Sequence, residues 1–292
     1  MSFREITDDS ERFVNSHGGD IVNNIVLINS KVLNKDYYMS KFRYFATGEG
    51  ENAYAFVVEQ NTVTFPFVTV RSPLKGINPD LLKEALTRII DEIKPFLEKH
   101  GRILVCLEGK SNISLIDAVG HEGYGFDQLK NAVHMFFSSD KQILRLSENV
   151  SPCPEGFIIS DVVVEADAET IHTHWPQAFQ ATIQATKDRL CLLPCVCARD
   201  IATGKIVSWM LSSPFGQYTL PEYRCRGLAR AVEQEMCRKM MRLGLRPFKY
   251  VDDFNTAVIE SSLRNYTRWE KNGKPVELYL TMVERRNTQI LK

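Results

Sequence analysis

The chain has 292 residues, 44% of them hydrophobic, with 36 basic and 36 acidic side chains. This composition is typical of a globular protein with one large domain or two ordinary ones. The charges balance, so we expect no nucleic-acid partner, and any anion site should be local. No apolar run is long enough to span a membrane. The seven scattered cysteines indicate reduced thiols in an intracellular protein.

The N-terminal half alternates strand-like and helix-like segments. A helix is predicted to begin at Pro79 because apolar residues then recur every three or four positions, and Gly101 should end it. Pro95 should kink that helix or end it early. A second, short helix is predicted over residues 111–119. The predicted strands of this half are apolar segments at 54–60, 63–70, 102–109 and 131–137.

A composition shift separates the two halves, because residues 147–156 hold two prolines, a glycine and small polar residues. We therefore predict an N-terminal domain over 1–150 and a C-terminal domain over 151–292. The strands predicted after the shift are 157–164, 193–200, 206–211, 247–254 and 276–283. The helices predicted there begin near 167, 176, 227 and 256. Together the elements predict an α/β (α+β) fold with a mixed, mostly antiparallel sheet and helices on both faces.

The segment YTLPEYRCRGLARAV, residues 218–232, joins a strand end to a helix through a basic turn. A helix N-terminus offers free backbone N–H groups and about half a positive charge. Gly227 lets an anion approach the backbone, and Arg224 and Arg226 add positive charge. These features predict a phosphate site. The alternative is that Gly227 only serves a tight turn and that the arginines are solvated.

The pattern R-x-x-G-x-A over residues 224–229 resembles the pyrophosphate-binding turn of GNAT acyltransferases. The segments at 207–211 (VSWML), 219–228 (TLPEYRCRGL) and 250–255 (YVDDFN) are similar, in the same order, to the C-terminal domain of glycine N-acyltransferases. The resemblance covers roughly residues 157–265. The N-terminal half shares only length and rhythm, and in the family it is a second GNAT-like domain without a coenzyme site. The resemblance thus implies two tandem GNAT-like domains.

The resemblance implies an N-acyltransferase that moves an acyl group from acyl-coenzyme A to a small amine, with glycine as a candidate acceptor. The amine attacks the thioester directly in a ternary complex. Coenzyme A would enter between strands near 218–220 and 248–253. The residues implied to hold it are Thr219, Leu220, Arg224, Cys225, Arg226, Gly227, Leu228, Ala229 and Asn255. Asn255 is equally well interpreted as the N-cap of the following helix.

The chain departs from the family in front of the basic turn. Only residues 212–217 lie between Leu211 and Tyr218, so the hairpin turn leaves three or four residues of strand, fewer than the usual ~5–6. Gln217 stands where glycine-conjugating members carry an acidic base, and an amide cannot take a proton at neutral pH. The alternative function is therefore a catalytically impaired module that binds coenzyme A or a protein partner.

Several residues are open candidates for proton transfer. Glu222 and Asp252, with its neighbour Asp253, are candidate bases. His172 and His174 are further candidate bases, although the better interpretation of each is a surface or packing histidine. Tyr266 is a candidate acid for the leaving thiolate, although it is equally well interpreted as a packed aromatic residue.

The cysteine pattern over residues 191–197, C-x3-C-x-C, lacks a fourth ligand, so we expect no metal. Because apolar residues surround Cys191, Cys195 and Cys197, we interpret all three as buried strand thiols. The acidic N-terminal segment lacks the pattern of a signal or transit peptide. We therefore expect a cytoplasmic location, with mitochondria as the alternative because glycine-conjugating relatives are often found there. We also expect a monomer without a membrane span.

Overall fold

The computed structural model describes residues 3–6, 29, 40–48, 54–61, 67–71, 79–109, 124–148, 152–175, 182–212 and 216–285. The chain divides into two compact units. Unit 1 holds Met1–Met135, Val251–Glu260 and Arg268–Lys292, and unit 2 holds Phe136–Tyr250 and Ser261–Thr267. The division first crosses the chain after Met135. Residue 150 lies outside the described ranges, so the boundary placed there from composition stays a prediction.

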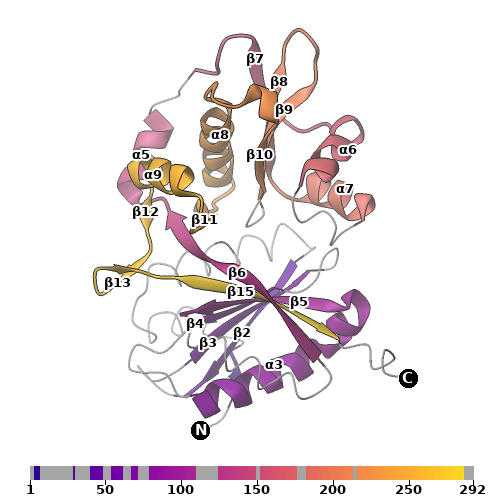
Figure 1. Cartoon of the computed structure of the whole chain (residues 1–292), viewed down its shortest axis with the longest axis vertical. Helices are drawn as coiled ribbons and strands as arrows, with labels where there is room; N and C mark the ends of the chain where they lie inside the picture. Colours follow the sequence, from indigo (N-terminus) through magenta and orange to yellow (C-terminus); the bar gives the residue numbers. More distant parts are fainter. Residues whose placement is uncertain are drawn as a thin grey trace. The chain divides into compact units, whose positions relative to one another are not determined.

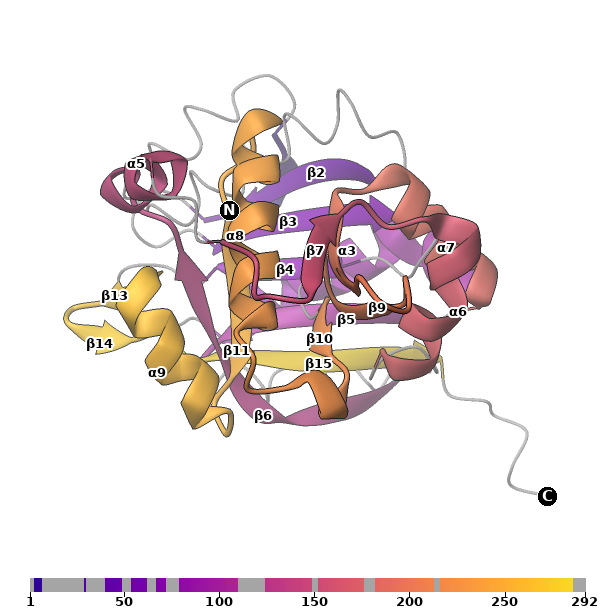
Figure 2. The same cartoon turned by 90° about the horizontal axis from the view of Figure 1, so that it is seen from above.

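Unit 1 is built on an extended sheet with one long helix. Its elements are β1 (Arg4–Glu5), β2 (Ser40–Thr47), β3 (Tyr54–Asn61), β4 (Phe67–Arg71), α3 (Pro79–His100), β5 (Arg102–Glu108), β6 (Tyr124–Phe137), β13 (Glu270–Lys271), β14 (Lys274–Pro275) and β15 (Leu278–Arg285). The strand order begins β1-β2-β3-β4-β5-β15-β6 and continues to β11 (Phe248–Asp252), while β12 (Thr267–Arg268) pairs with β6. Figure 2 shows β2, β3, β4, β5 and β15 side by side in this sheet. From β1 to β6 neighbouring strands are antiparallel except β4 and β5, which are parallel.

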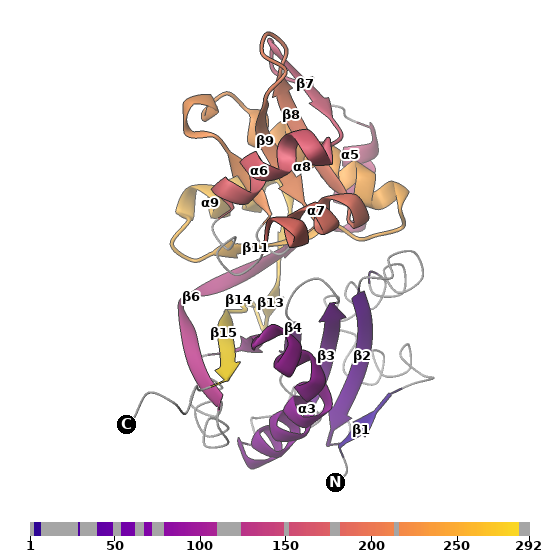
Figure 3. The same cartoon turned by 90° about the vertical axis from the view of Figure 1, so that its right-hand side faces the viewer.

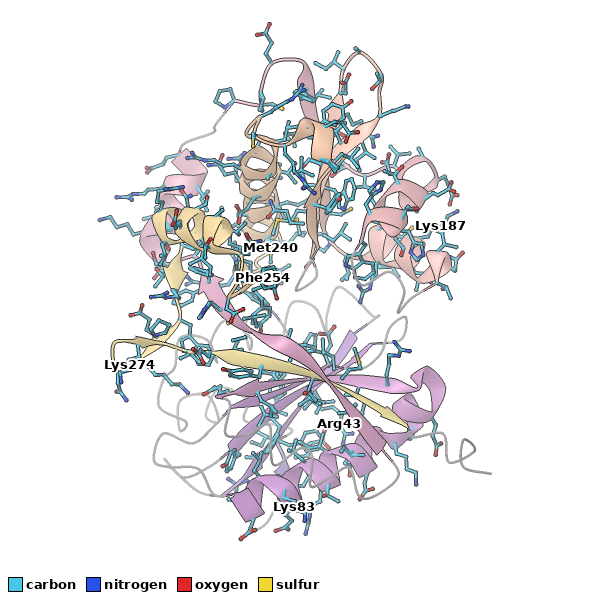
Figure 4. The ribbon with its side chains drawn as sticks, in the orientation of Figure 1. Arg43, Lys83, Lys187, Met240, Phe254 and Lys274 are labelled. Carbon is cyan, nitrogen blue, oxygen red and sulfur yellow. The ribbon has the colours of Figure 1, made fainter. Side chains whose placement is uncertain are left out.

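Helix α3 covers one face of this sheet (Figure 3). Its residues Leu82, Leu86 and Ile89 recur at helical spacing and are buried against strand residues such as Phe56 and Ile103. Each such side chain contributes about 1.5–3 kcal/mol when it is fully buried. Arg43 on β2, labelled in Figure 4, forms ion pairs with Glu5 of β1 (2.6 Å) and Glu92 of α3 (3.1 Å). It thus connects β2 both to the neighbouring strand and to the helix.

Most elements predicted in the N-terminal half are found in the structure. The strands predicted at 54–60 and 63–70 are β3 and β4, the long helix begins at Pro79, and Gly101 follows its end with φ +74°. Of the two alternatives at Pro95, an early end of α3 was wrong, because the helix runs on to His100, and a kink there stays a prediction. Pro95 is exposed, so the carbonyl that its missing N–H frees is open to water. The helix predicted over 111–119 lies outside the described residues.

Unit 2 contains a four-stranded antiparallel sheet with the order β10-β9-β8-β7. Its elements are α5 (Asp140–Glu148), β7 (Phe157–Ser160), α6 (Val164–His174), α7 (Ile183–Leu192), β8 (Cys195–Asp200), β9 (Ile206–Leu211), β10 (Gln217–Thr219), η5 (Pro221–Tyr223) and α8 (Leu228–Arg242). After β11, α9 spans Thr256–Asn265 and passes from unit 1 to unit 2. Figure 1 shows α8 on one side of the strands and α6 and α7 on the other. The fold is therefore mixed α/β with mostly antiparallel sheets, as predicted.

Helix α5 was not predicted, although the sequence carries its start signal. The Ser139 hydroxyl accepts the Gln142 N–H (3.4 Å), and the Gln142 side-chain oxygen accepts the Ser139 N–H (2.8 Å). This reciprocal pair is a capping box. Elsewhere the predicted strand 157–164 ends at Ser160, because α6 already begins at Val164. Of the helices in the described ranges, none has the length and apolar character needed to cross a membrane.

Strand β10 returns from β9 through a glycine in close contact with the chain. A Cβ built on Gly216 would lie 2.8 Å from both the Cβ and the carbonyl oxygen of Leu211. Only glycine fits such an approach without displacement. The Leu211 N–H donates to the Gly216 oxygen (3.0 Å) and closes the hairpin. The strand that follows has three residues, so the short strand expected from the sequence is confirmed.

A buried ion pair joins helix α6 to strand β8. The Arg199 guanidinium binds both carboxylate oxygens of Asp167, with an Nη1–Oδ1 distance of 2.9 Å, and this hydrogen bond raises the pKa of Arg199. The same carboxylate accepts the N–H of Val163 (2.7 Å) at the start of α6. The Asp167 side chain is only 3% exposed. Removal of Arg199 would therefore leave the Asp167 carboxylate buried without its partner, which lowers the stability of the fold.

Replacement of Arg199 by methionine should lower the free energy of unfolding by about 3–5 kcal/mol, because it leaves the Asp167 carboxylate buried and unpaired. Urea denaturation followed by tryptophan fluorescence measures this loss. Arg242→Met is the matched control, since Arg242 pairs with Glu235 (2.8 Å) on the surface and its side chain is 62% exposed. The control should lose less than about 1 kcal/mol. Equal losses in the two variants would contradict the role given to Arg199.

Candidate anion-binding site

The turn between η5 and α8 carries two residues in the left-handed region. Cys225 has φ +59° and Gly227 has φ +80°. Backbone turns with residues in this conformation direct N–H groups into a shared concavity that binds anions. A Cβ on Gly227 would meet only the Cγ of Pro154, at 3.7 Å. Glycine is therefore required here by its backbone conformation and not by lack of space.

Helix α8 begins at Leu228 without a capping side chain on Gly227 and without an acidic residue in its first turn. Its hydrogen bonding starts with the Ala231 N–H, which donates to the Gly227 oxygen (3.1 Å). The N–H groups of Leu228, Ala229 and Arg230 precede that bond, so they are the ones that a helix leaves free. They form the positive end of the helix dipole. The first turn of α8 is thus suited to a negative group.

Two exposed arginines flank this helix start. Arg224 donates from Nε to the Thr219 oxygen (3.1 Å), and its guanidinium carbon lies 5.4 Å from the centre of the Tyr218 ring. Arg226 donates to the Glu222 oxygen (3.2 Å) and lies over the Tyr223 ring. A guanidinium has five N–H donors, so each keeps donors for an anion. Both contacts orient the side chains beside the turn.

Strand β10 is the edge strand of its sheet, since β9 pairs with it on one side. The Gly216 oxygen and the Leu220 N–H both bond to β9, to Leu211 (3.0 Å) and Val207 (2.9 Å). Because antiparallel bonds alternate, the N–H of Thr219 faces the open edge. The Leu220 oxygen accepts the Tyr223 N–H (2.9 Å), so its backbone is committed within the protein. Thr219 and Leu220 were both implied to hold the coenzyme. Of the two, only Thr219 has a backbone N–H that is directed away from β9 and is available to a ligand.

Gln217 occupies the position where an acidic base was sought. Its side-chain Nε2 donates to the Ala229 oxygen (2.8 Å) in the first turn of α8. Side chains alternate along a strand, so the next residue, Tyr218, points to the opposite face. There its ring lies 5.4 Å from the Trp209 ring and 5.8 Å from the His174 ring. Residue 217 thus ties β10 to α8 and does not face the side on which Tyr218 lies.

The other predicted site residues lie in different surroundings. Glu222 is exposed on η5. Asp252 is half-buried, and burial together with the neighbouring charge of Asp253 raises its pKa. The backbone oxygen of Asn255 accepts the N–H groups of Val258 (3.1 Å) and Ile259 (3.0 Å). Asn255 therefore occupies the N-cap position of α9. Asp252 and Asn255 belong to unit 1 and the turn belongs to unit 2, so their part in one site stays a prediction.

Tyr266 is packed in the interior of unit 2. Its side chain is 7% exposed, its hydroxyl lies 3.2 Å from the sulfur of Cys237 on α8, and Lys249 lies over its ring at 4.5 Å. Burial raises the pKa of Tyr266 well above its usual range and that of the Cys237 thiol to about 12. These contacts favour the packed aromatic residue over the proton donor.

Two of the three cysteines interpreted as buried strand thiols are so placed: Cys195 and Cys197 are buried on β8, and burial raises the pKa of both thiols. The same interpretation of Cys191 was wrong, because it is exposed near the end of helix α7. In the described ranges no three potential ligands are grouped to hold a metal ion. Cys225 in the basic turn is exposed.

Compared by sequence, the chain matches no family model and no curated protein. Compared by structure, it is similar to a protein of Drosophila, with a TM-score of 0.69 and 14% identity over 96% of this chain and 97% of that chain. It is also similar to a GCN5-related N-acetyltransferase from Sphaerobacter thermophilus, with a TM-score of 0.53 and 15% identity over 98% and 96% of the two chains. The chain has a GCN5-related N-acetyltransferase (GNAT) fold. At these identities the similarity shows the fold alone.

A third structure, a tandem GNAT protein from the clavulanic acid biosynthesis pathway, has a TM-score of 0.49 and 10% identity over 97% of each chain. The general GNAT resemblance of the sequence is confirmed at the level of the fold. The closer resemblance to glycine N-acyltransferases depends on the sequence motifs and stays a prediction.

Replacement of Gln217 by glutamate should not supply the missing base and should destabilise unit 2 by about 1–3 kcal/mol. The new carboxylate would face the Ala229 oxygen, an acceptor, in place of an amide donor. Urea denaturation measures the loss. Gln217→Met removes the same bond without adding charge, so it should lose only about 0.5–1.5 kcal/mol. A glutamate variant as stable as the native protein would show that residue 217 does not contact α8.

Proposed function

We propose that this protein is an N-acyltransferase that uses acyl-coenzyme A as the donor and a small amine as the acceptor, with glycine as a candidate. The observation that supports this most strongly is the uncapped start of α8, flanked by Arg224 and Arg226, on a GNAT fold. The sequence motifs around 207–228 and 250–255 favour the glycine-conjugating branch. The coenzyme is a co-substrate that leaves after each turnover.

The residues of the turn fit a diphosphate. The N–H groups from Arg226 to Ala229 and the positive end of α8 would accept negative charge, and the guanidiniums of Arg224 and Arg226 would add charge-assisted hydrogen bonds. The first turn of α8 carries no carboxylate to repel it. Cys225 would lie beside the diphosphate because its left-handed conformation forms part of the turn.

The pantetheine arm would then follow the open edge of β10, with the Thr219 N–H as a backbone donor. The acceptor amine would attack the thioester carbon directly, which requires no covalent intermediate on the enzyme. A backbone N–H at this edge would stabilise the negative oxygen that develops in the transition state. Asp252, Glu222 and Asn255 remain proposed contributors to this site.

Replacement of Gly227 by glutamate should weaken the binding of an acyl-coenzyme A at least about tenfold, which corresponds to about 1.4 kcal/mol. The variant places a bulky carboxylate at the site proposed for the diphosphate. Isothermal calorimetry with acetyl-coenzyme A measures the dissociation constant. Gly204→Glu is the matched control, because Gly204 also has a positive φ (+68°) but lies in the β8–β9 turn. Equal affinity in the Gly227 variant and the native protein would refute the site.

Bound acyl-coenzyme A should protect Cys225 from alkylation. Cys225 and Cys191 are both exposed, but Cys191 lies at the end of α7, outside the proposed site. Mass spectrometry after brief treatment with iodoacetamide, with and without acetyl-coenzyme A, measures the modification of each thiol. We expect at least a fivefold slower reaction at Cys225 and no change at Cys191. Unchanged labelling of both residues at saturating acetyl-coenzyme A would contradict the placement of the diphosphate.

The three-residue β10 is the observation behind the alternative, a module that binds coenzyme A without transfer. A thiol-release assay separates the two functions. Acetyl-, octanoyl- and benzoyl-coenzyme A are tested with glycine and other small primary amines. Release of free thiol that depends on the amine excludes the non-catalytic module. Tight binding of the donor without such release would establish it.

A further inference from the structure

His174, at the end of α6, is held in one tautomer. Its Nδ1 lies 2.9 Å from the backbone oxygen of Thr170, one turn earlier in the helix. A carbonyl oxygen can only accept a hydrogen bond, so Nδ1 carries a proton. In the neutral imidazole the other nitrogen, Nε2, therefore presents its lone pair. This is the form that a proton acceptor requires.

The ring of His174 lies beside the residues of the candidate site. Its centre is 5.8 Å from the Tyr218 ring of β10 and 6.2 Å from the Trp209 ring of β9. The guanidinium of Arg224 lies over the same Tyr218 ring at 5.4 Å. The imidazole and an arginine of the basic turn thus contact the same aromatic ring. Tyr218 is the titratable group recorded in contact with His174 from β10, while Trp209 and the Thr170 carbonyl are neutral.

The two faces of β10 differ in what they offer. On the α8 side, the Gln217 amide is bonded to the Ala229 oxygen. On the opposite side, Tyr218 contacts His174, which is half-buried and so keeps access to solvent. The basic nitrogen, Nε2 of His174, therefore lies on the face of β10 that is turned toward α6.

We propose that His174 accepts the proton of the acceptor amine; this inference rests on the proposed acyl transfer. The amine nitrogen attacks the thioester carbon and forms the C–N bond, while its proton passes to Nε2. The C–S bond then breaks with its electron pair on sulfur, and the proton passes from Nε2 to the thiolate. The products are the amide and free coenzyme A, and the imidazole returns to its neutral state. No oxidant or reductant is needed.

The test compares kcat, KM and their pH profiles for the native protein and His174→Asn, with acetyl-, octanoyl- or benzoyl-coenzyme A, whichever supports the fastest transfer. The asparagine amide can keep the bond to the Thr170 oxygen, but it removes Nε2. We expect kcat to fall at least about 100-fold, with an unchanged dissociation constant for the acyl-coenzyme A. The pH profile of kcat at saturating amine, which reports groups in the bound complex, should lose its fall on the acid side.

His172→Gln is the matched control on the same helix. His172 bonds through Nδ1 to the Thr186 hydroxyl (2.8 Å) of α7 and has no part in the proposed step. It should keep the pH profile and a kcat within about threefold of the native value. Circular dichroism melts show that each variant is folded. A His174 variant with native kcat and pH profile would overturn this inference alone, whereas a native protein without amine-dependent thiol release would overturn the proposed transfer as well.

Discussion

Strand β10 is the constraint on which the candidate site depends. It is three residues long and forms the edge of its sheet, so its backbone is held on one side by β9. Side-chain contacts compensate for the short ladder. The Ser208 and Thr219 hydroxyls lie 2.8 Å apart, Gln217 reaches α8, and the Arg224 side chain returns to the Thr219 oxygen. Each neutral bond contributes only about 0.5–1.5 kcal/mol, but together they fix where the basic turn begins.

The position of the turn then decides the electrostatics of the helix start. Gly216 allows β10 to return closely against Leu211, and Gly227 allows the chain to enter α8 through a left-handed residue. The free N–H groups at the start of α8 consequently lie a few residues after the open edge of β10. A ligand with a diphosphate and an extended amide-containing arm matches this sequence of polar groups. The two glycines act for different reasons, one through close packing and one through backbone conformation.

Much of this arrangement could be predicted from local sequence. Residues 206–211 were predicted as a strand and form β9 with the same bounds. The helix predicted to begin near 227 is α8, whose buried residues include Leu228, Val232 and Met236. The local signal for α5 was present in the spacing of Ser139 and Gln142 but was overlooked. The exposed position of Pro95 in α3 could not be known from the sequence, because it depends on which face of the helix packs.

Contacts between distant residues set the limit of such prediction. Cys237 and Tyr266 are 29 positions apart, and their contact follows from how α9 ends against α8. His172 and His174 were both interpreted as surface or packing residues, since their spacing places them on different faces of a helix. The spacing separates the two side chains, but it does not reveal which face of α6 packs against β10. The Thr170 and Tyr218 contacts distinguish the two histidines, and only the folded chain supplies them.

The orientation of Gln217 changes how the missing acid should be understood. A glutamine in place of a base suggests lost catalysis only if that side chain faces the reacting groups. Here it is bonded to α8, while the aromatic face of β10 carries Tyr218 and, beside it, an imidazole with a defined tautomer. A proton acceptor supplied from α6 does not require a longer β10. The short strand and a working proton transfer are therefore compatible, because the base need not belong to the strand that is proposed to bind the thioester.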